Sequence, residues 1–230
     1  MNRRFKTKPE VDLGTMVMKT KPALACLPDI AINSQVGVIG GSFNPPHLGH
    51  QLLALSFLAL EPIEQLWIIP CESHAFKGDV SDFKHRLAMC KLAFQRINKV
   101  QVLDIERHLK KPNFTILTID AIKSARPDLS IVFGLGSDLV TDFAKWHRAQ
   151  ELVSKTQVVI FERESYPIKQ LPPILKSARF HEGYVLPNMN STELRQRLHQ
   201  VGGSPMDAFL DRDVARYISD NQLYRGVAEN

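Results

Sequence analysis

The sequence predicts an α/β fold in which helices cover both faces of a doubly wound parallel sheet. Short apolar runs alternate along the chain with segments whose apolar residues recur at helical spacing. Runs that are apolar at every position are typical of strands buried on both faces, as strands in parallel sheets are. Right-handed crossovers between parallel strands then give a doubly wound sheet. The ligand crevice of such a sheet is expected beyond the carboxyl ends of its strands.

Each element follows from a local pattern that begins after residue 35. The first strand leads through a turn at 41–46 into an apolar helix, which Pro62 ends, and Pro70 stops the second strand. Leu87, Cys90 and Phe94 have the spacing that predicts a helix after that strand. We expect strands at residues 36–40, 66–69, 100–105, 130–133 and 156–161, and one more at 184–186. We expect helices at residues 48–60, 83–96, 115–124, 148–154, 191–200 and 211–221.

Length and composition fit one good-sized globular domain. The chain has 230 residues, of which 44% are hydrophobic and 23% are charged. This composition excludes a disordered polymer, a collagen-like fibre and a small scaffold held by disulfides. The most apolar stretch, residues 52–60, is shorter than the roughly 18–20 residues of a membrane helix and contains Ser56. We therefore expect no membrane partner.

The positive charge gathers in the first 34 residues. The whole chain has 29 Lys and Arg against 24 Asp and Glu, a net charge of +5. Residues 1–34 hold six basic and three acidic side chains, so this segment alone has a net charge of +3. Because the segment looks irregular, we interpret it as a solvated arm rather than a polynucleotide-binding tail, and no nucleic-acid partner is expected. The expected organisation is a basic leader at 1–34 and one domain at 35–225, whose C-terminal helical part spans about 188–225.

The three cysteines, Cys26, Cys71 and Cys90, are too few and too scattered for a disulfide framework or a four-thiolate zinc site. They suit a reducing compartment. The leader also lacks the apolar segment of roughly 7–15 residues that a secretory signal needs. The sequence therefore predicts a cytoplasmic protein.

The clearest motif for chemistry lies between the first strand and the next helix, where residues 40–50 read Gly-Gly-Ser-Phe-Asn-Pro-Pro-His-Leu-Gly-His. Gly40 and Gly41 let the backbone pass close to a bulky anion and offer amide donors. The helix N-terminus just beyond adds partial positive charge. His47 and His50 share one face of a helical turn, where imidazoles can donate hydrogen bonds to phosphoryl oxygens. The motif therefore predicts a site for nucleotide phosphates.

Other interpretations explain less of this motif. A zinc site would need a third protein ligand, and no obvious one stands nearby in the sequence. A helix cap would account for one histidine but not for the whole string. The string also lacks the Gly-Lys-Ser/Thr end of a P-loop and the G-x-G-x-x-G spacing of a dinucleotide site. Binding of nucleotide phosphates is therefore favoured.

The string resembles the T/S-x-F-x-P-x-H-x-G-H signature of the nucleotidyltransferase superfamily of α/β phosphodiesterases, whose two histidines correspond to His47 and His50. The resemblance implies a Rossmann-like fold. It also implies an enzyme that joins a nucleoside triphosphate to a phosphorylated acceptor and releases pyrophosphate. The residues that it implies for ATP binding in this turn are Gly40, Gly41, Ser42 and Phe43.

A second segment near the carboxyl end, Met-Asn-Ser-Thr-Glu-Leu-Arg, resembles the family's I-S-x-T-x-x-R signature. Its own residues predict a helix start, since Asn190 and Glu193 form a variant of the capping box. Ser191 and Thr192 place hydroxyls and free amides there, and Arg195 lies about one turn further on, which suits an anion. An ordinary capped helix with a surface arginine would be favoured if the segment stood alone. The presence of the first motif, in the expected order, reverses that preference.

The middle of the chain resembles one branch of the superfamily, the nicotinate or nicotinamide mononucleotide adenylyltransferases. The resemblance rests on residues 69–77, 85–89, 133–146 and 214–224. The acceptor-binding residues that it implies are Lys77, Thr115, Asp138 and Trp146. Trp146 offers a flat face for a pyridine ring, and Asp138 could hold a ribose hydroxyl or belong to the metal environment. A solvated lysine, helix caps and a half-buried core tryptophan are the alternatives that the residues alone leave open.

Three departures from this branch fall around the acceptor. The family's Pro-Pro-His before the lysine is here His74-Ala-Phe76, an Asp after the family's Tyr-Thr pair is Leu117, and an aromatic after the tryptophan is Ala149. They leave adenylyl transfer as the expected reaction and put the pyridine acceptor in question. The choice between nicotinate and nicotinamide mononucleotide stays open, as does the oligomeric state.

The implied reaction is attack of a mononucleotide phosphate on the α-phosphorus of ATP, a step of NAD biosynthesis that expels pyrophosphate. The attacking phosphate is already nucleophilic, so catalysis consists of positioning and charge stabilisation. His47, His50 and Arg195 are the expected catalytic residues, the histidines at the α/β-phosphates and Arg195 with Ser191 and Thr192 at the β/γ end. Mg²⁺ is expected to enter with ATP on the substrate's own oxygens, without protein ligands. The alternatives are another phosphorylated acceptor, such as phosphopantetheine, and a nucleotide-binding sensor without catalysis.

Overall fold

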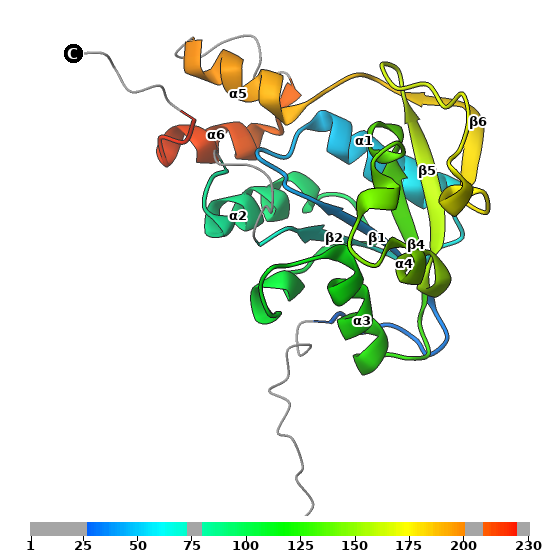
Figure 1. Ribbon diagram of the computed structural model, residues 1–230. Coiled ribbons are helices and arrows are strands. Elements are labelled where there is room, and N and C mark those ends of the chain that lie inside the picture. Colours follow the sequence, from blue (N-terminus) through cyan, green and yellow to red (C-terminus); the bar gives the residue numbers. More distant parts are fainter. Residues whose placement is uncertain (1–26, 73–79, 201–208, 225–230) are drawn as a thin grey trace, which may run out of the picture.

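A computed structural model describes residues 27–72, 80–200 and 209–224. Six strands in this part of the chain form one parallel sheet in the order β3-β2-β1-β4-β5-β6 (Figure 1). The winding of the chain reverses between β1 and β4, and sheets of this kind bind ligands beyond the carboxyl ends of the strands at that point. The expected doubly wound, Rossmann-like α/β fold is therefore confirmed. The strands are β1 (Gln35–Gly41), β2 (Gln65–Pro70), β3 (Val100–Val102), β4 (Ser130–Gly136), β5 (Gln157–Arg163) and β6 (Arg179–Leu186).

Helices cover both faces of the sheet. On one face lie α3 and α4, and on the other α1, α2, α5 and α6 (Figure 1). Among the described helices none is long and apolar enough to cross a membrane. The helices are α1 (Leu48–Leu60), α2 (Phe83–Phe94), α3 (Thr115–Ala125), α4 (Ala149–Lys155), α5 (Ser191–Gln200) and α6 (Arg212–Asp220). Short 3-10 turns lie at η1 (Ile105–His108), η2 (Ser137–Leu139), η3 (Phe143–Lys145) and η4 (Pro173–Leu175).

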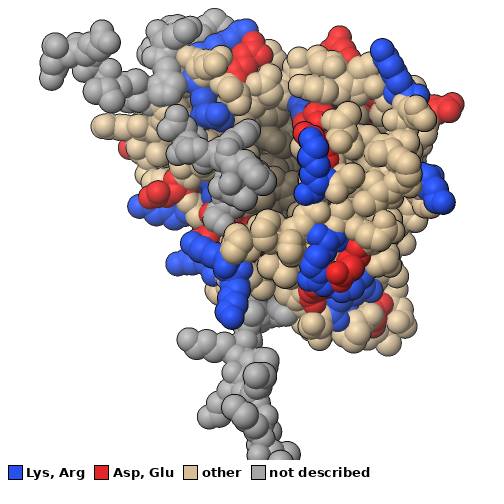
Figure 2. All heavy atoms as spheres, viewed as in Figure 1, with Lys and Arg blue, Asp and Glu red and all other residues tan. Residues whose placement is uncertain are grey.

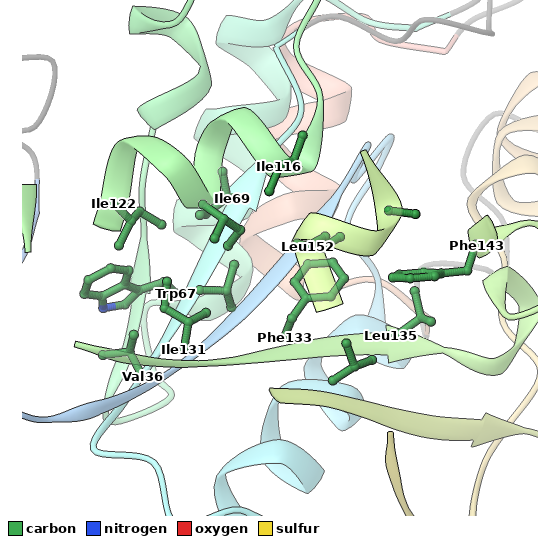
Figure 3. Close-up of a cluster of buried hydrophobic side chains, with 14 of the residues drawn as sticks. Val36, Trp67, Ile69, Ile116, Ile122, Ile131, Phe133, Leu135, Phe143 and Leu152 are labelled. Carbon is green, nitrogen blue, oxygen red and sulfur yellow. The ribbon is translucent and has the colours of Figure 1, made fainter. Parts of the chain in front are cut away.

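Two apolar clusters hold these helices to the sheet. In the cluster of Figure 3, Trp67 and Phe133 of the sheet pack with Leu152 of α4. The cluster on the other face includes Phe57 of α1 and Ile218 of α6. All five side chains are at most 5% exposed. Because both faces of the sheet are covered at its centre, the middle stretches of β1, β2, β4 and β5 are buried and almost entirely apolar, which is the pattern that predicted a parallel sheet.

The structure lengthens several of the expected strands and shortens one. β4 reaches Gly136 because it continues to pair with β5, and β5 reaches Arg163 because its last residues pair with β6. β6 begins at Arg179, ahead of the expected start at 184. The expected strand at 100–105 is wrong beyond Val102, since β3 pairs with β2 alone and the chain then turns into η1.

The chain just before β1 packs against the folded body from residue 27 onward. Leu27 and Ile30 lie against the cluster of Figure 3. The guanidinium of Arg126 donates to the backbone carbonyls of Ile30 and Ala31. The end of the expected leader is thus in contact with the domain, whereas residues 1–26 lie outside the described residues.

Candidate active site

The turn after β1 stands at the point where the winding of the sheet reverses. Phe43 has a φ of 46°, in the left-handed region that bulky residues rarely adopt. Its ring is buried and packs edge-on against Phe94, with 6.3 Å between the centroids. The N–H of Cys71, the first residue after β2, donates to the carbonyl of Gly41 at 2.8 Å. This hydrogen bond fixes the start of the turn. Burial and hydrogen bonding therefore fix a backbone shape that the local sequence alone would not favour.

The two histidines lie against each other at the start of α1. Their ring centroids are 3.9 Å apart, which confirms that they share one face. The backbone N–H of His47 donates to Nδ1 of His50 at 3.2 Å, so the proton of a neutral His50 ring is on Nε2. Nδ1 of His47 is buried and has no hydrogen-bond partner in the described part of the chain. A buried polar atom without a partner marks a position where a ligand atom can bond.

Burial keeps both imidazoles neutral. It lowers the pKa of His47 to about 3, with a further contribution from the positive charge of Arg163. Burial is also the main cause that lowers the pKa of His50, followed by the charges of His47 and Arg163. Near neutral pH the rings are therefore hydrogen-bonding groups rather than cations.

The second sequence motif lies directly against the first. Oγ of Ser191 donates to the carbonyl of Pro45 at 3.0 Å, and Nη1 of Arg195 donates to the carbonyl of Asn44 at 2.8 Å. Nη2 of Arg195 also lies 3.4 Å from Oγ1 of Thr192. The start of α5 thus meets the turn before α1, although these residues stand 146 and 151 positions apart in the sequence (Figure 1).

The N–H of Glu193 donates to Oδ1 of Asn190 at 2.8 Å, which confirms Asn190 as the cap of α5.

The start of α5 and the start of α1 fit together through Gly49, a residue that the sequence analysis did not select. A methyl group on Gly49 would lie 3.0 Å from the ring of His47 and 3.1 Å from Cβ of Met189. Gly49 therefore leaves the space in which His47 and Met189 lie side by side.

Arg163, the last residue of β5, is a site residue that the sequence analysis missed. Its Nη1 lies 3.1 Å from Oδ2 of Asp138, and its Nη2 donates to the carbonyl of Met189. Its backbone N–H donates to Oγ of Ser137 at 2.9 Å. Arg163 thus connects the ends of β4 and β5 with the segment that leads into α5. The feature that could have revealed it is its position, a basic residue at the carboxyl end of a strand.

The residues expected at the acceptor lie at the start of α3 and around η3. Thr115 is the first residue of α3, and Trp146 follows η3. The ring of Trp146 is partly buried, 5.1 Å from that of Phe143 and 6.2 Å from that of Phe133. The described geometry therefore leaves one part of the indole packed on the core and another part exposed.

Phe114 and His147 bring these two segments together. Their rings stack at 4.4 Å with 26° between the planes. Since Phe114 precedes Thr115 and His147 follows Trp146, the start of α3 adjoins the segment after η3. Two expected acceptor residues therefore come from neighbouring parts of the structure.

The other acceptor-side positions have different outcomes. Lys77, and with it the departure at 74–76, lies outside the described residues. Leu117 and Ala149 pack against the cluster of Figure 3, and Ala149 is buried. These two departures therefore lie in the core packing, two residues after Thr115 and three after Trp146.

Comparison with known proteins identifies the family. The family model described as Cytidylyltransferase-like matches residues 38–197. The probable nicotinate-nucleotide adenylyltransferase of Gemmatimonas aurantiaca is 32% identical over 199 residues, which cover 83% of this chain and 92% of the relative. The nicotinate-nucleotide adenylyltransferase of Bacillus subtilis is 29% identical over 192 residues, which cover 83% and 98%. The chain belongs to the nicotinate-nucleotide adenylyltransferase branch of the cytidylyltransferase-like family.

Membership of this branch makes the chain an adenylyltransferase and confirms the resemblance seen in the sequence. A solved structure has the same fold, that of Plasmodium falciparum nicotinic acid mononucleotide adenylyltransferase complexed with NaAD. Its TM-score is 0.71 at 23% identity, with 83% of this chain and 97% of that chain covered.

The surface of this adenylyltransferase is hollowed on the face that Figure 2 shows. The hollow lies between the side of the molecule that contains α5 and the side that contains β5 and β6. Basic and acidic side chains are mixed around it, without one large patch of a single sign. Within the described residues no group of three or more His, Cys, Asp and Glu side chains could hold a metal ion.

Proposed function

We propose that the chain transfers the adenylyl group of ATP to the phosphate of nicotinate mononucleotide, which forms the dinucleotide and releases pyrophosphate in NAD biosynthesis. Family membership supports the reaction, and the names of the relatives support the nicotinate acceptor. The structural observation that supports it most is the contact of Ser191 and Arg195 with the turn before His47. This contact places two helix N-termini and two neutral imidazoles around one turn, which suits a chain of phosphates.

The proposed chemistry needs no covalent intermediate with the protein. An oxygen of the acceptor phosphate attacks the α-phosphorus of ATP and forms a P–O bond, while the bond from that phosphorus to the β-phosphate oxygen breaks. The electron pair of the broken bond leaves with pyrophosphate. His50 would donate a hydrogen bond from Nε2 to an α-phosphoryl oxygen, where negative charge grows in the transition state. His47 would offer a second bond through Nδ1, which has no partner among the described residues.

We assign the remaining phosphates to cationic and hydroxyl groups around the same turn. Gly40, Gly41, Ser42 and Phe43 would contribute backbone contacts, and Ser191, Thr192 and Arg195 would bind the β/γ end. Triphosphates bind enzymes together with a divalent cation that their own oxygens largely hold, and we propose Mg²⁺ for this role. The carboxylate of Asp138 is paired with Arg163, whose guanidinium also donates to the carbonyl of Met189 just before α5.

The acceptor would lie on the side of Thr115 and Trp146. The partly buried indole of Trp146 offers a flat face for the pyridine ring. Asp138 and Thr115 carry groups that can bond ribose hydroxyls, and Lys77 would add a positive charge for the acceptor phosphate. The cytoplasmic location expected from the sequence stays a prediction.

The proposal is tested by pyrophosphate release from ATP and Mg²⁺ with one acceptor at a time. Nicotinate mononucleotide, nicotinamide mononucleotide and phosphopantetheine are offered separately. We expect release with nicotinate mononucleotide and formation of the corresponding dinucleotide. Release with phosphopantetheine alone would overturn the acceptor assignment. If no pyrophosphate is released with any of the three acceptors although ATP binds measurably, a nucleotide-binding sensor would be favoured.

A further inference from the structure

Arg86, in the first turn of α2, is buried beneath the turn that follows β1, and the reaction above gives it no role. The residue is 2% exposed. Its guanidinium donates to three backbone carbonyls in three separate segments of the chain. These bonds are Nη1 to Ser42 at 2.9 Å, Nε to Ser81 at 2.9 Å and Nη2 to Glu72 at 3.3 Å.

Two of these bonds help to close a ring of contacts around the turn. Arg86 holds the carbonyl of Ser42, and it also holds the carbonyl of Ser81. The N–H of Ser81 in turn donates to Oδ1 of Asn44 at 3.2 Å. Arg86 and Ser81 therefore hydrogen-bond to the turn at Ser42 and Asn44, and Arg86 and Ser81 are also hydrogen-bonded to each other.

The third bond joins the turn to the chain that leaves β2. The carbonyl of Glu72 accepts from Arg86, while its N–H donates to Oε2 of Glu106 at 2.9 Å. One residue earlier, the N–H of Cys71 donates to the carbonyl of Gly41. The ends of β1 and β2 are thus fixed relative to each other, and Arg86 contacts both.

The hydrogen-bond acceptors of Arg86 are neutral, while the buried carboxylate of Glu106 attracts its positive charge. All three hydrogen bonds go to uncharged carbonyls, and the guanidinium also lies over the ring of Phe83, 5.6 Å from its centroid. Burial lowers the pKa of Arg86, although a guanidinium stays charged at neutral pH. A buried charge is costly, and hydrogen bonds with fixed geometry are what make it tolerable.

We propose that Arg86 is a positioning residue of the adenylyl transfer, which fixes the turn at residues 41–44 in the shape that receives the phosphates of ATP. The inference rests on the proposed function, since that function makes this turn the phosphate site. Lysine cannot replace Arg86 in this role, because one ammonium group on a flexible stem does not reproduce a planar fork that reaches three carbonyls.

The test compares the wild type with Arg86→Lys and with the control Arg96→Lys. The Arg96 side chain is 69% exposed and pairs with Asp211 and Asp213, away from the turn. ATP affinity is measured by calorimetry, kcat and KM by pyrophosphate release, and folding by circular dichroism and thermal melting. We expect Arg86→Lys to fold, to bind ATP about tenfold more weakly and to lose about a hundredfold in kcat, since small misplacements have effects of this size. Arg96→Lys should stay within about twofold of the wild type on every measure.

Each other outcome is decisive. If folded Arg86→Lys keeps its ATP affinity and kcat within about threefold of the wild type, the proposal is overturned while the proposed function stands. A loss of thermal stability with unchanged kinetics overturns it too, because Arg86 would then be purely structural. If Arg86→Lys does not fold, Arg86→Gln is measured in the same way, and failure of both to fold assigns Arg86 to folding and overturns the proposal. If the wild type itself releases no pyrophosphate, the proposed function fails, and ATP affinity alone decides the role of Arg86.

Discussion

A histidine in water has a pKa near 6.5, whereas the fold lowers the pKa of His47 to about 3. The direct cause is removal from water next to Arg163, and the pKa of His50 is lowered by the same surroundings. A neutral imidazole attracts phosphate oxygens less strongly than a charged imidazolium would, but it can still donate one directed hydrogen bond from its N–H. Such a donor stabilises charge that develops during the reaction more than charge already present in the substrate, which is the condition for a higher kcat.

The donor at Nε2 of His50 can be tested by substitution. His50→Ala removes it, and we expect kcat to fall about 10²–10³-fold while the fold stays intact. His50→Gln places an amide N–H near the position of Nε2 and should recover part of that loss, whereas His50→Asn places its amide near Nδ1 and should not. Steady-state kinetics on the three folded variants make the comparison. Near-normal turnover of His50→Ala would contradict the catalytic role.

The neutral state of His47 predicts how stability depends on pH. The unfolded chain binds a proton at this residue below about pH 6.5, and the folded chain does so only near pH 3, so acid favours unfolding between these values. Above about pH 6.5 the effect vanishes. Between about pH 7.5 and about pH 5, His47→Gln should lose about 2 kcal/mol less free energy of unfolding than the wild type. Urea denaturation at both pH values measures the difference, and equal losses would show that His47 titrates normally in the folded protein.

Gly49 allows stability and activity to be separated. Gly49→Ala adds a methyl group 3.0 Å from the ring of His47, so the ring must shift. Alanine also favours a helix over glycine by about 1 kcal/mol, which offsets much of the strain. We expect a melting temperature close to that of the wild type and a fall in kcat/KM of about tenfold to a hundredfold. Unchanged kinetics would mean that the site tolerates a displaced His47.

At the scale of elements, the site is built where helices begin and strands end. α1 and α5 both start beside the turn, as the bond from Ser191 to the carbonyl of Pro45 shows. Each helix start brings free N–H groups and partial positive charge. Arg163 adds the end of β5 to the same place. One anionic ligand would therefore contact elements from three distant parts of the sequence.

The opposite end of α1 provides a test in which stability changes and catalysis does not. Glu61, just after α1, is buried and pairs with Arg179 and with Nε2 of His181 at 2.8 Å. A helix of this length spans about 20 Å, so the pair is remote from His47. Glu61→Gln should lower the free energy of unfolding by about 1–2 kcal/mol, because it weakens the charge-assisted hydrogen bonds from Arg179 and His181, whose side chains are 47% and 32% exposed. Urea denaturation checks this value, and kcat/KM of the folded variant should stay unchanged.

The sequence predicted the elements where the deciding contacts are local. The starts of α1, α2 and α5 were predicted correctly, since turns, caps and apolar spacing lie within a few residues of each start. Strand ends were predicted less well, because β4 extends by pairing with β5, β5 extends by pairing with β6, and β3 ends for lack of a second neighbour. The roles of Arg163 and Arg86 were not predicted either, because they also depend on contacts that are not local. Their partners Met189 and Ser42 stand 26 and 44 positions away in the sequence, where no local pattern reaches.

At the scale of the whole molecule, the parallel sheet explains why the two sequence motifs meet. Parallel strands place all of their carboxyl ends along one edge, and the reversal of winding between β1 and β4 opens a crevice there. The first motif follows β1, and the second follows β6 after the chain has crossed to the other side of the sheet. The contact of Arg195 with Asn44 is thus a consequence of topology, and it could be inferred from the sequence only by resemblance to a family.

The boundary of the folded body can be tested by truncation. Leu27 and Ile30 pack on the core, and Arg126 donates to the carbonyls of Ile30 and Ala31, so a chain that begins at residue 35 loses both kinds of contact. Partial burial of two aliphatic side chains and loss of these bonds should cost about 2 kcal/mol of unfolding free energy relative to a chain that begins at residue 27. Urea denaturation of the two truncated chains measures this cost.

Both truncated chains should keep the kcat of the full chain, because these contacts lie on the α3 face and not at the turn before His47. If the chain from residue 27 lost activity while remaining folded, residues 1–26 would have a function in the reaction, and salt-sensitive binding of DNA or RNA by the full chain alone would favour the polynucleotide-binding tail.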